Sequence, residues 1–183
     1  AHLLGTQEID KDLEKVILEK TEGIPFFIEE LLKALKELRI IKRKDNKYQL
    51  AKDINAGVIP STIQDIIMAQ VDLLPDAAKT VLQTGSVIER EFSHELIKRV
   101  TGLPEEPLLT YLSSLKDSEL LYERGMYPQT SYVFRHALTR EVVYNSILAR
   151  KKKELHEKIG KSIEELYKDN LAEHYEVLAE HFI

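Results

Sequence analysis

The stretch that decides the fold is Phe134-Arg-His-Ala-Leu-Thr-Arg-Glu-Val-Val-Tyr144. Just before it, the apolar segments 120–124 and 131–134 flank a turn that contains Gly125, and this pattern predicts a short β-hairpin. After it, apolar residues recur at helical spacing to the end of the chain. We therefore expect His136 where a strand passes into a helix, and the unpaired N–H groups at the start of a helix suit anions.

The apolar spacing before the hairpin predicts a run of short helices. Ser61 and Gln64 have the spacing of a capping box, and Pro75 can open the next helix. Ser93 is a plausible N-cap of the helix after that, and Pro104 opens another. Three short helices followed by a β-hairpin are typical of a winged helix, a variant of helix-turn-helix.

The first part of the chain predicts two helices and a small hairpin. Asp10 is a plausible N-cap for a helix that Gly23 brings to an end. Pro25 suits the first turn of the next helix, and residues 45–46 predict the turn of the hairpin. Residues 53–59 have the character of a linker and mark the best internal boundary.

The last part of the chain predicts two helices that pair as an antiparallel hairpin with one apolar face uncovered. Such a unit usually buries that face against neighbours in a repeat array. The predicted fold class is mainly α with small β-hairpins. It comprises a helical domain with a small hairpin, a winged-helix domain, and a helical linker that begins an array: 1–55, 56–136 and 137–183.

The amino-acid composition excludes or disfavours several classes of function. With 26 basic and 31 acidic residues the net charge is -5, so the chain has no general attraction to nucleic acid or anionic membranes. It has no cysteine, which excludes disulfides, cysteine zinc sites and thiol nucleophiles and fits a reducing cytoplasm. No apolar run approaches the roughly 20 residues that span a bilayer. The chain begins without Met and ends within a helical pattern, so we expect a piece of a longer protein.

The sequence contains no self-sufficient active site, and we expect the chain not to be an enzyme by itself. It lacks the phosphate-binding G-x-x-x-x-G-K-[ST] loop, the dinucleotide-binding G-x-G-x-x-G loop and the G-x-S-x-G nucleophile setting. Adjacent acidic pairs such as Glu29-Glu30 diverge by about 100° on a helix, so they indicate solvated charge rather than an acid–base couple.

Among the six histidines, His136 has the most distinctive setting, beside Arg135 and Arg140. A histidine in such a place more often packs under the wing or caps the helix than binds a ligand. His174 and His181 lack the H-E-x-x-H spacing, so a solvated helix face is expected there and no metal site. The other three are expected at the surface: His2, His94 and His156.

A winged helix raises the possibility of DNA binding, in which the helix before the wing enters the major groove. That helix, 104–119, carries four acidic residues against Lys116, and carboxylates repel phosphates. The basic cluster 150–153 is soon followed by Glu154 and Glu157, which is typical of a solvated face. Binding to DNA in the usual mode is therefore disfavoured.

At this point the residues resemble a known family. Thr21-Glu-Gly-Ile-Pro-Phe-Phe-Ile-Glu-Glu-Leu-Leu32 is similar to the TEGNPFF-x-EELL segment of large ATPases linked to class III adenylyl cyclases. Four later segments continue the resemblance in the same order: Pro60-Ser-Thr-Ile-Gln-Asp-Ile-Ile67, Leu74-Pro-x-x-Ala-Lys-x-Val-Leu82, Ser86-Val-Ile-Glu-Arg-Glu-Phe92 and 134–144. These proteins belong to the STAND class of signal-transduction ATPases and resemble NB-ARC switches and MalT-type activators.

The resemblance implies a P-loop domain before this chain and a sensor array, often of TPR repeats, after it. The chain would run from the helical domain to a first TPR-like hairpin. The turn at Gly23 and Pro25 corresponds to a GLPL-type motif whose proline packs near the adenine, and His136 to an MHD-type histidine that contacts the β-phosphate of ADP. Two residues depart from the family pattern, Ile24 in place of Asn and Glu89 in place of Gly.

The resemblance thus implies a non-catalytic regulatory and linker module, with ATP or ADP bound in the whole protein and none expected on this chain alone. Its expected partners are the preceding P-loop domain, the following helical repeats and proteins that bind the array, without nucleic acid or membrane. Two alternatives stay open: a DNA-binding transcription regulator, and a protein-interaction scaffold if His136 is buried and the tail docks a partner.

Overall fold

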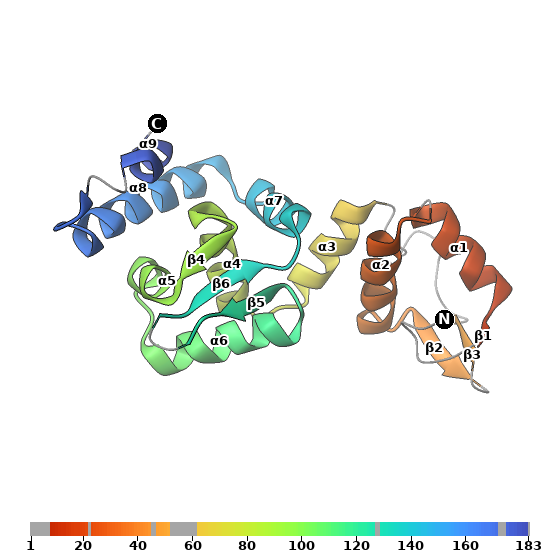
Figure 1. Cartoon of the computed structure of the whole chain (residues 1–183). Coiled ribbons are helices and arrows are strands. Elements are labelled where there is room, and N and C mark those ends of the chain that lie inside the picture. Colours follow the sequence, from red (N-terminus) through yellow and green to blue (C-terminus); the bar gives the residue numbers. More distant parts are fainter. Residues whose placement is uncertain are drawn as a thin grey trace. The chain divides into compact units, whose positions relative to one another are not determined.

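The computed structural model describes residues 8–21, 23–44, 47–51, 62–126, 129–171 and 175–182. The protein is mainly helical with a few short strands, which confirms the predicted fold class (Figure 1). The chain divides into two compact units, Ala1–Leu73 and Leu74–Ile183. In the part that the structure describes, no helix is both long and apolar enough to cross a membrane.

Among its described residues, the first unit holds three helices and a three-stranded sheet. Its elements are β1 (Glu8–Ile9), α1 (Lys11–Thr21), α2 (Pro25–Glu37), β2 (Ile41–Lys44), β3 (Lys47–Leu50) and α3 (Ile63–Asp72). The strand order is β1-β3-β2, in which β2 and β3 form the predicted antiparallel hairpin. Strand β1 pairs in parallel with β3 and was not predicted. The predicted turn at 45–46 lies outside the described residues.

Local capping residues explain where α1 and α2 begin. The N–H of Asp12 donates to Oδ1 of Asp10 at 2.8 Å, which confirms Asp10 as the N-cap of α1. Gly23 has a φ of +76° just past the end of α1, a left-handed conformation that favours glycine. Pro25 is the first residue of α2, where its missing N–H leaves no hydrogen bond unmade.

Helix α3 begins one residue later than the sequence suggested. Its capping box joins Thr62 and Asp65: the N–H of Asp65 donates to Oγ1 of Thr62 at 3.1 Å, and the N–H of Thr62 donates to Oδ2 of Asp65 at 3.0 Å. The predicted pair, Ser61 and Gln64, is therefore wrong, and Ser61 itself lies outside the described residues. Threonine and aspartate suit these two positions equally well, so spacing alone did not fix the register.

The boundary between the units differs from the predicted one. Residues 53–59 were expected to separate the first domain from the second, but the division falls after Leu73. The reason is that α3 packs against α2, and its Ile66 belongs to the core that Leu13, Leu31 and Leu35 form. The predicted linker lies outside the described residues.

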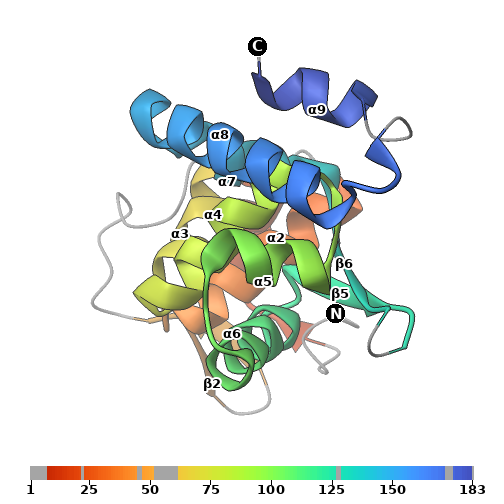
Figure 2. The ribbon, with the colours of Figure 1, turned by 90° about the vertical axis from the view of Figure 1, so that its left-hand side faces the viewer.

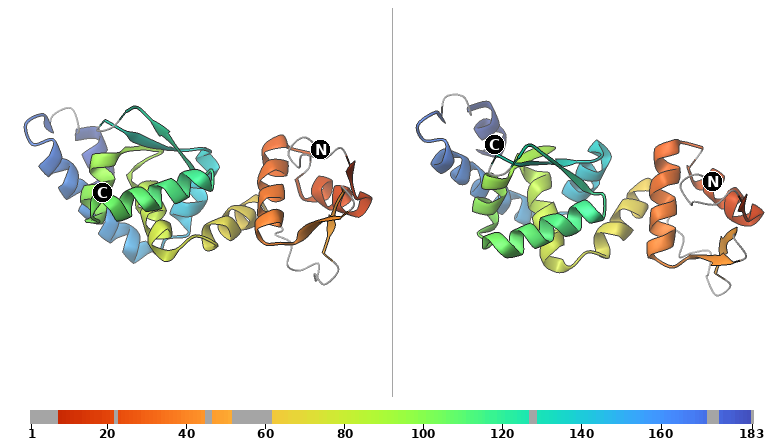
Figure 3. Two further views of the ribbon diagram at one scale, coloured as in Figure 1. Left: turned by 90° about the horizontal axis from the view of Figure 1, so that it is seen from below. Right: turned by 60° about the horizontal axis from the view of Figure 1, so that its bottom comes forward.

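The second unit contains the predicted winged helix and the helices that follow it. Its elements are α4 (Asp76–Ile88), β4 (Glu91–Ser93), α5 (His94–Thr101), α6 (Glu105–Asp117), β5 (Leu121–Arg124), β6 (Ser131–Phe134), α7 (Ala137–Asn145), α8 (Ala149–Leu166) and α9 (Tyr175–Phe182). The antiparallel strand order is β4-β6-β5, and β4 was not predicted. Figure 3 shows α6, in green, beside the hairpin of β5 and β6, in teal.

The helices after the wing belong to the same compact unit. Helix α8 packs against α4 and α5, and α9 packs against α8 (Figure 2). Leu178 of α9 is buried, whereas Phe182 is half exposed. The predicted hairpin of two C-terminal helices is therefore present, while its likeness to a TPR repeat stays a prediction.

Helices α2 and α6 end in the same way, immediately before a hairpin. Arg39 and Glu119 each have a φ of 56°, the left-handed conformation that ends a Schellman motif. The N–H of Ile40 donates to the carbonyl of Leu35 at 2.9 Å, and the N–H of Leu120 donates to the carbonyl five residues before it at 3.1 Å. Ile40 and Leu120 are both buried, so each hairpin starts from an anchored residue.

Helix α4 is the centre of the second unit, because α5, α6, α7, α8 and β4 all pack on it. Residues 84–88 are all buried. The hydroxyls of Thr84 and Ser86 donate to carbonyls of the same helix at 2.9 and 2.7 Å, so both are satisfied inside the core. At Gly85 the ring of Phe92 comes so close that a Cβ would lie 2.6 Å from it.

We predict that Gly85→Ala destabilises the second unit by about 2 kcal/mol, because the buried ring of Phe92 must shift to admit a methyl group. In an unconstrained helix the same change stabilises by about 1 kcal/mol. A loss of stability at Gly85 would therefore by itself indicate a steric clash with Phe92. Urea unfolding, monitored by circular dichroism, measures the free energy of unfolding of the two proteins.

Gly160→Ala is the matched control. A Cβ at this position would lie 2.5 Å from the ring of Phe182, but that ring is 51% exposed and is free to turn away. We expect a much smaller loss of stability there. Equal losses at the two glycines would contradict the prediction.

Candidate functional site

The predicted site residues fall in different units. Gly23 and Pro25 belong to the first unit, and His136 belongs to the second. The contacts proposed for them with adenine and with phosphate therefore involve separate compact bodies of the chain, and both stay predictions.

Gly23 and Ile24, which precede α2, are both exposed. The N–H of Ile24 donates to the carbonyl of Thr21 at 2.9 Å, and the carbonyl of Ile24 accepts from the N–H of Ile28 at 3.0 Å. No atom lies within 4 Å of a Cβ placed on Gly23, so its positive φ rather than crowding is what favours glycine there. Pro25 and Ile24 are both exposed, which leaves an apolar surface at the position where the resemblance puts the adenine contact.

His136 lies where β6 passes into α7, as predicted. It is the N-cap residue of α7, and its carbonyl accepts from the N–H groups of Thr139 at 3.1 Å and Arg140 at 3.4 Å. Its imidazole makes no cap hydrogen bond to the first turn of the helix. The side chain is half buried, with its Nε2 atom inside the protein. The structure therefore excludes side-chain capping as the reason for a histidine here.

The backbone around His136 is held from two sides. The N–H of Arg135 donates to the carbonyl of Leu120 at 3.1 Å, which ties the junction to the wing. The N–H of Phe134 donates to the carbonyl of Arg90 at 2.9 Å, which ties it to the residue before β4. Phe134 is fully buried. The backbone that leads into His136 is thus held by the wing and by the residue before β4, and the backbone that leaves it belongs to the first turn of α7.

Arg140 fixes α7 on the central helix. Its Nε donates to the carbonyl of Ser86 at 2.9 Å, in the last turn of α4, where carbonyl groups are short of partners and favour a cation. The stretch 134–144, which predicted the position of His136, therefore also contains Arg140, the residue that attaches α7 to α4.

His94 was expected at the surface, and this was wrong. It is 5% exposed, its Nε2 lies 2.8 Å from Oε1 of Glu105, and its Nδ1 lies 3.4 Å from the hydroxyl of Tyr132. A hydrogen bond from Lys98 lowers the pKa of Glu105, and His94 lowers it further against the opposing effect of burial. Burial, with the charges of Glu123 and Glu105, raises the pKa of Tyr132 to about 12. This network joins α5, α6 and β6 and is structural.

Two further histidines are paired rather than solvated, again contrary to expectation. Nδ1 of His156 on α8 lies 2.8 Å from Nδ1 of His181 on α9, and Nε2 of His156 lies 3.3 Å from the hydroxyl of Tyr144. Because the two facing atoms are both Nδ1, only one of them carries hydrogen when both rings are neutral. Nε2 of His181 is buried and has no hydrogen-bond partner among the described residues.

Burial, together with nearby positive charges, favours the neutral form of both rings. Burial lowers the pKa of His156, and the charges of Lys152 and Arg140 lower it further. Burial, followed by the charges of His156 and Arg140, lowers the pKa of His181 from 6.5 to about 4. When both rings are protonated, two N–H groups face each other and the hydrogen bond between His156 and His181 is lost.

The acidic pair Glu29-Glu30 was expected to be solvated, and this was wrong for one member. Glu30 is 5% exposed, with the Nζ of Lys33 3.4 Å from its Oε1. In the ranges that the structure describes, no three or more His, Asp or Glu side chains gather so as to hold a metal ion.

Comparison with known proteins adds one match. A family described as a domain of unknown function (DUF8739) matches residues 1–48, a range that contains Gly23 and Pro25 and ends within β3. No curated protein matches the chain. Neither result names an activity.

We predict that the free energy of unfolding falls as the pH is lowered from 6.5 to about 4, because the unfolded chain then binds protons that His181 in the folded chain does not. His181→Phe removes this linkage and flattens the dependence. Chemical denaturation of both proteins across that pH range measures it. Parallel curves for the two proteins would show that the pair contributes nothing.

Proposed function

We propose that this chain is a non-catalytic regulatory and linker module of a STAND signal-transduction ATPase. It couples the nucleotide state of a preceding P-loop domain to a following helical array. The observation that carries the proposal is the setting of His136: a rigid strand-to-helix junction holds it, and its imidazole is not used to cap the helix.

The element order around His136 supports this proposal. The wing and β4 fix the backbone on either side of Phe134, and α7, α8 and α9 follow directly. A ligand that engages His136 would therefore act on the same junction that starts the helical tail. The array to which that tail would lead is TPR-like in this proposal, and the protein works in the cytoplasm.

The mechanism is a shift between two packings. ADP that bridges the P-loop domain and His136 favours a closed arrangement, whereas exchange for ATP with an input on the array favours an open one. Most of the affinity for phosphate belongs to the P-loop domain, so this chain alone holds nucleotide weakly or not at all. In this proposal Gly23 and Pro25 shape the turn that contacts the adenine.

DNA binding is the alternative that the charges disfavour. Helix α6 begins with Glu105 and Glu106, and its Lys116 is already paired with Glu123 of the wing. A winged helix that reads DNA needs basic side chains that are available to phosphates. A scaffold role has one observation in its favour, the exposed aromatic rings of Tyr175 and Phe182 on α9.

The test is ADP retention by a longer protein that includes the preceding domain. His136→Ala should speed ADP loss about tenfold or more, since a charge-assisted contact to phosphate is removed. Release of a fluorescent ADP analogue measures the rate, and circular dichroism checks the fold.

Arg135→Ala is the matched control, because it removes a neighbouring side chain whose ion pair with Glu119, at 3.1 Å, lies on the surface. Its ADP release should equal that of the wild type. If His136→Ala also leaves release unchanged, the nucleotide role is lost and the chain is a structural connector.

A further inference from the structure

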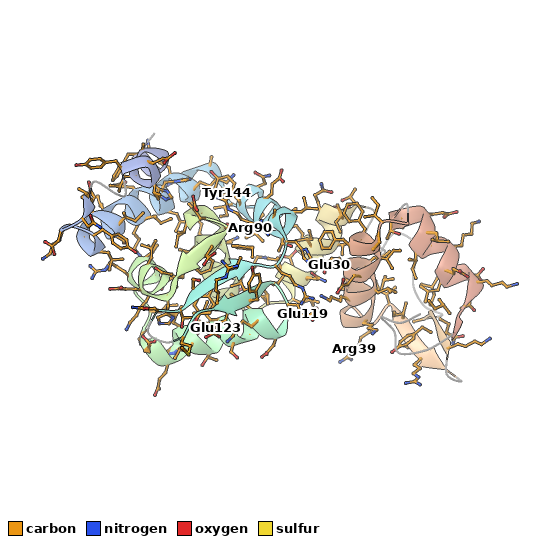
Figure 4. All side chains as sticks on the ribbon, viewed as in Figure 1. Glu30, Arg39, Arg90, Glu119, Glu123 and Tyr144 are labelled. Atoms are coloured by element: carbon orange, nitrogen blue, oxygen red, sulfur yellow. The ribbon has the colours of Figure 1, made fainter. Side chains whose placement is uncertain are left out.

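A hollow lies beside α7 in the second unit. We name it the α7 hollow; its volume is about 350 Å³, and it is lined by Arg90, Ala137, Arg140, Glu141 and Tyr144. Figure 4 shows Arg90 and Tyr144 next to each other on this side of the unit. The volume is near the lower end of the range for ligand sites, which suits a small ligand rather than an extended one.

The lining of the α7 hollow is positively charged in a chain whose net charge is -5. It contains two guanidinium groups, from Arg90 and Arg140, against the one carboxylate of Glu141. Lys152 lies at the flank, with its Nζ 4.1 Å from the centre of the Tyr144 ring.

The guanidinium groups of the α7 hollow are available to a ligand. Arg90 forms no ion pair within the part of the chain that the structure describes. Arg140 uses Nε for the carbonyl of Ser86 at 2.9 Å, and this bond orients the side chain while its two Nη groups make no further hydrogen bond to described residues. An arginine that is oriented by one bond loses less freedom when it binds an anion.

A second charged hollow of the same unit serves as a comparison. It is lined by Glu95, Lys98, Arg99, Gly102 and Leu103. There the cations are already neutralised: Nζ of Lys98 lies 2.6 Å from Glu105, and Nη1 of Arg99 lies 2.8 Å from Glu165. A further hollow, between α4, α5 and α8, is lined mainly by apolar and threonine side chains. The α7 hollow thus differs from both in presenting arginine without a carboxylate partner.

We propose that the α7 hollow is a binding site for a phosphate group, held by Arg90 and Arg140. A guanidinium group binds two oxygens side by side, and a phosphate offers enough terminal oxygens for two such groups, whereas a carboxylate offers two in all. Glu141 opposes the anion and keeps its affinity modest. The site goes beyond the proposed function, because it needs only this chain and not a P-loop domain, although Ala137 directly follows His136.

The experiment is a titration of the 183-residue chain with pyrophosphate, followed by the backbone amide shifts of Arg90, Ala137 and Tyr144. Adenosine and acetate are titrated in parallel, as a nucleoside without phosphate and as a carboxylate. We expect saturable shifts with pyrophosphate at millimolar concentration or below, and none that saturate with adenosine or acetate. A tighter response to acetate, or no saturation with pyrophosphate, would overturn the proposal.

Three variants distinguish specific binding of pyrophosphate in the α7 hollow from a nonspecific effect of net charge. Arg90→Ala should weaken pyrophosphate binding by about fivefold or more, and Glu141→Gln should tighten it by removing the opposing charge. Arg99→Ala makes the same change in net charge at the comparison hollow and should leave binding unchanged. If Arg90→Ala and Arg99→Ala have equal effects, the site does not exist.

The two proposals fail separately. Loss of the pyrophosphate site leaves the ADP-retention test with His136→Ala unaffected, because that test uses the P-loop domain. Conversely, unchanged ADP retention with intact pyrophosphate binding would remove the nucleotide role of His136 and keep the α7 hollow. Arg140→Ala is not the primary variant, since it also breaks the bond to Ser86 that docks α7.

Discussion

The last turn of α4 is enclosed on every side, and the rest of the second unit depends on how that turn is contacted. Gly85 admits the ring of Phe92 at a distance that no side chain would allow, and this contact brings β4 against the helix. One residue later, the carbonyl of Ser86 accepts from Arg140 at 2.9 Å and brings α7 to the same turn. Arg90, which precedes β4, and Arg140 of α7 consequently line one hollow. A packing constraint in the core thus determines where two surface charges meet.

The elements that the sequence predicted are those whose signals are local. Asp10, Pro25 and Ser93 each define a helix start through residues that lie within one turn of them, and all three lie where they were expected. Strands β1 and β4 were missed because two or three residues carry no periodicity, and only a distant partner strand makes them visible. The unit boundary was displaced for a similar reason, since the attachment of α3 to α2 is a tertiary contact.

The candidate site was predictable only in part, for the same physical reason. The position of His136 follows from a change of period within one stretch of sequence, which needs no knowledge of other elements. Its surroundings do not follow, because Arg90 comes from a distant part of the sequence and is brought next to Phe134 by the pairing of β4 with β6. His94 and His156 were placed at the surface because their partners, Glu105 and His181, lie on other helices. Helical spacing predicts which face of its helix a residue occupies, but it does not predict which side chain of another element packs against that face.

The distribution of ion pairs gives the charges of this chain a functional meaning. On α8, Lys161 pairs with Glu157 and Arg150 pairs with Glu154, each one turn away, so these two cations are largely neutralised on the exposed face of the helix. Lys116 is likewise paired with Glu123 of the wing, so its charge is already neutralised there. At the junction where the wing meets the helical tail, Arg90 and Arg140 line one hollow and form no ion pair with the described residues. A winged helix arranged in this way is suited to recognising one phosphate group at a fixed point, and that is the kind of contact by which a small ligand can set the position of the helices that follow.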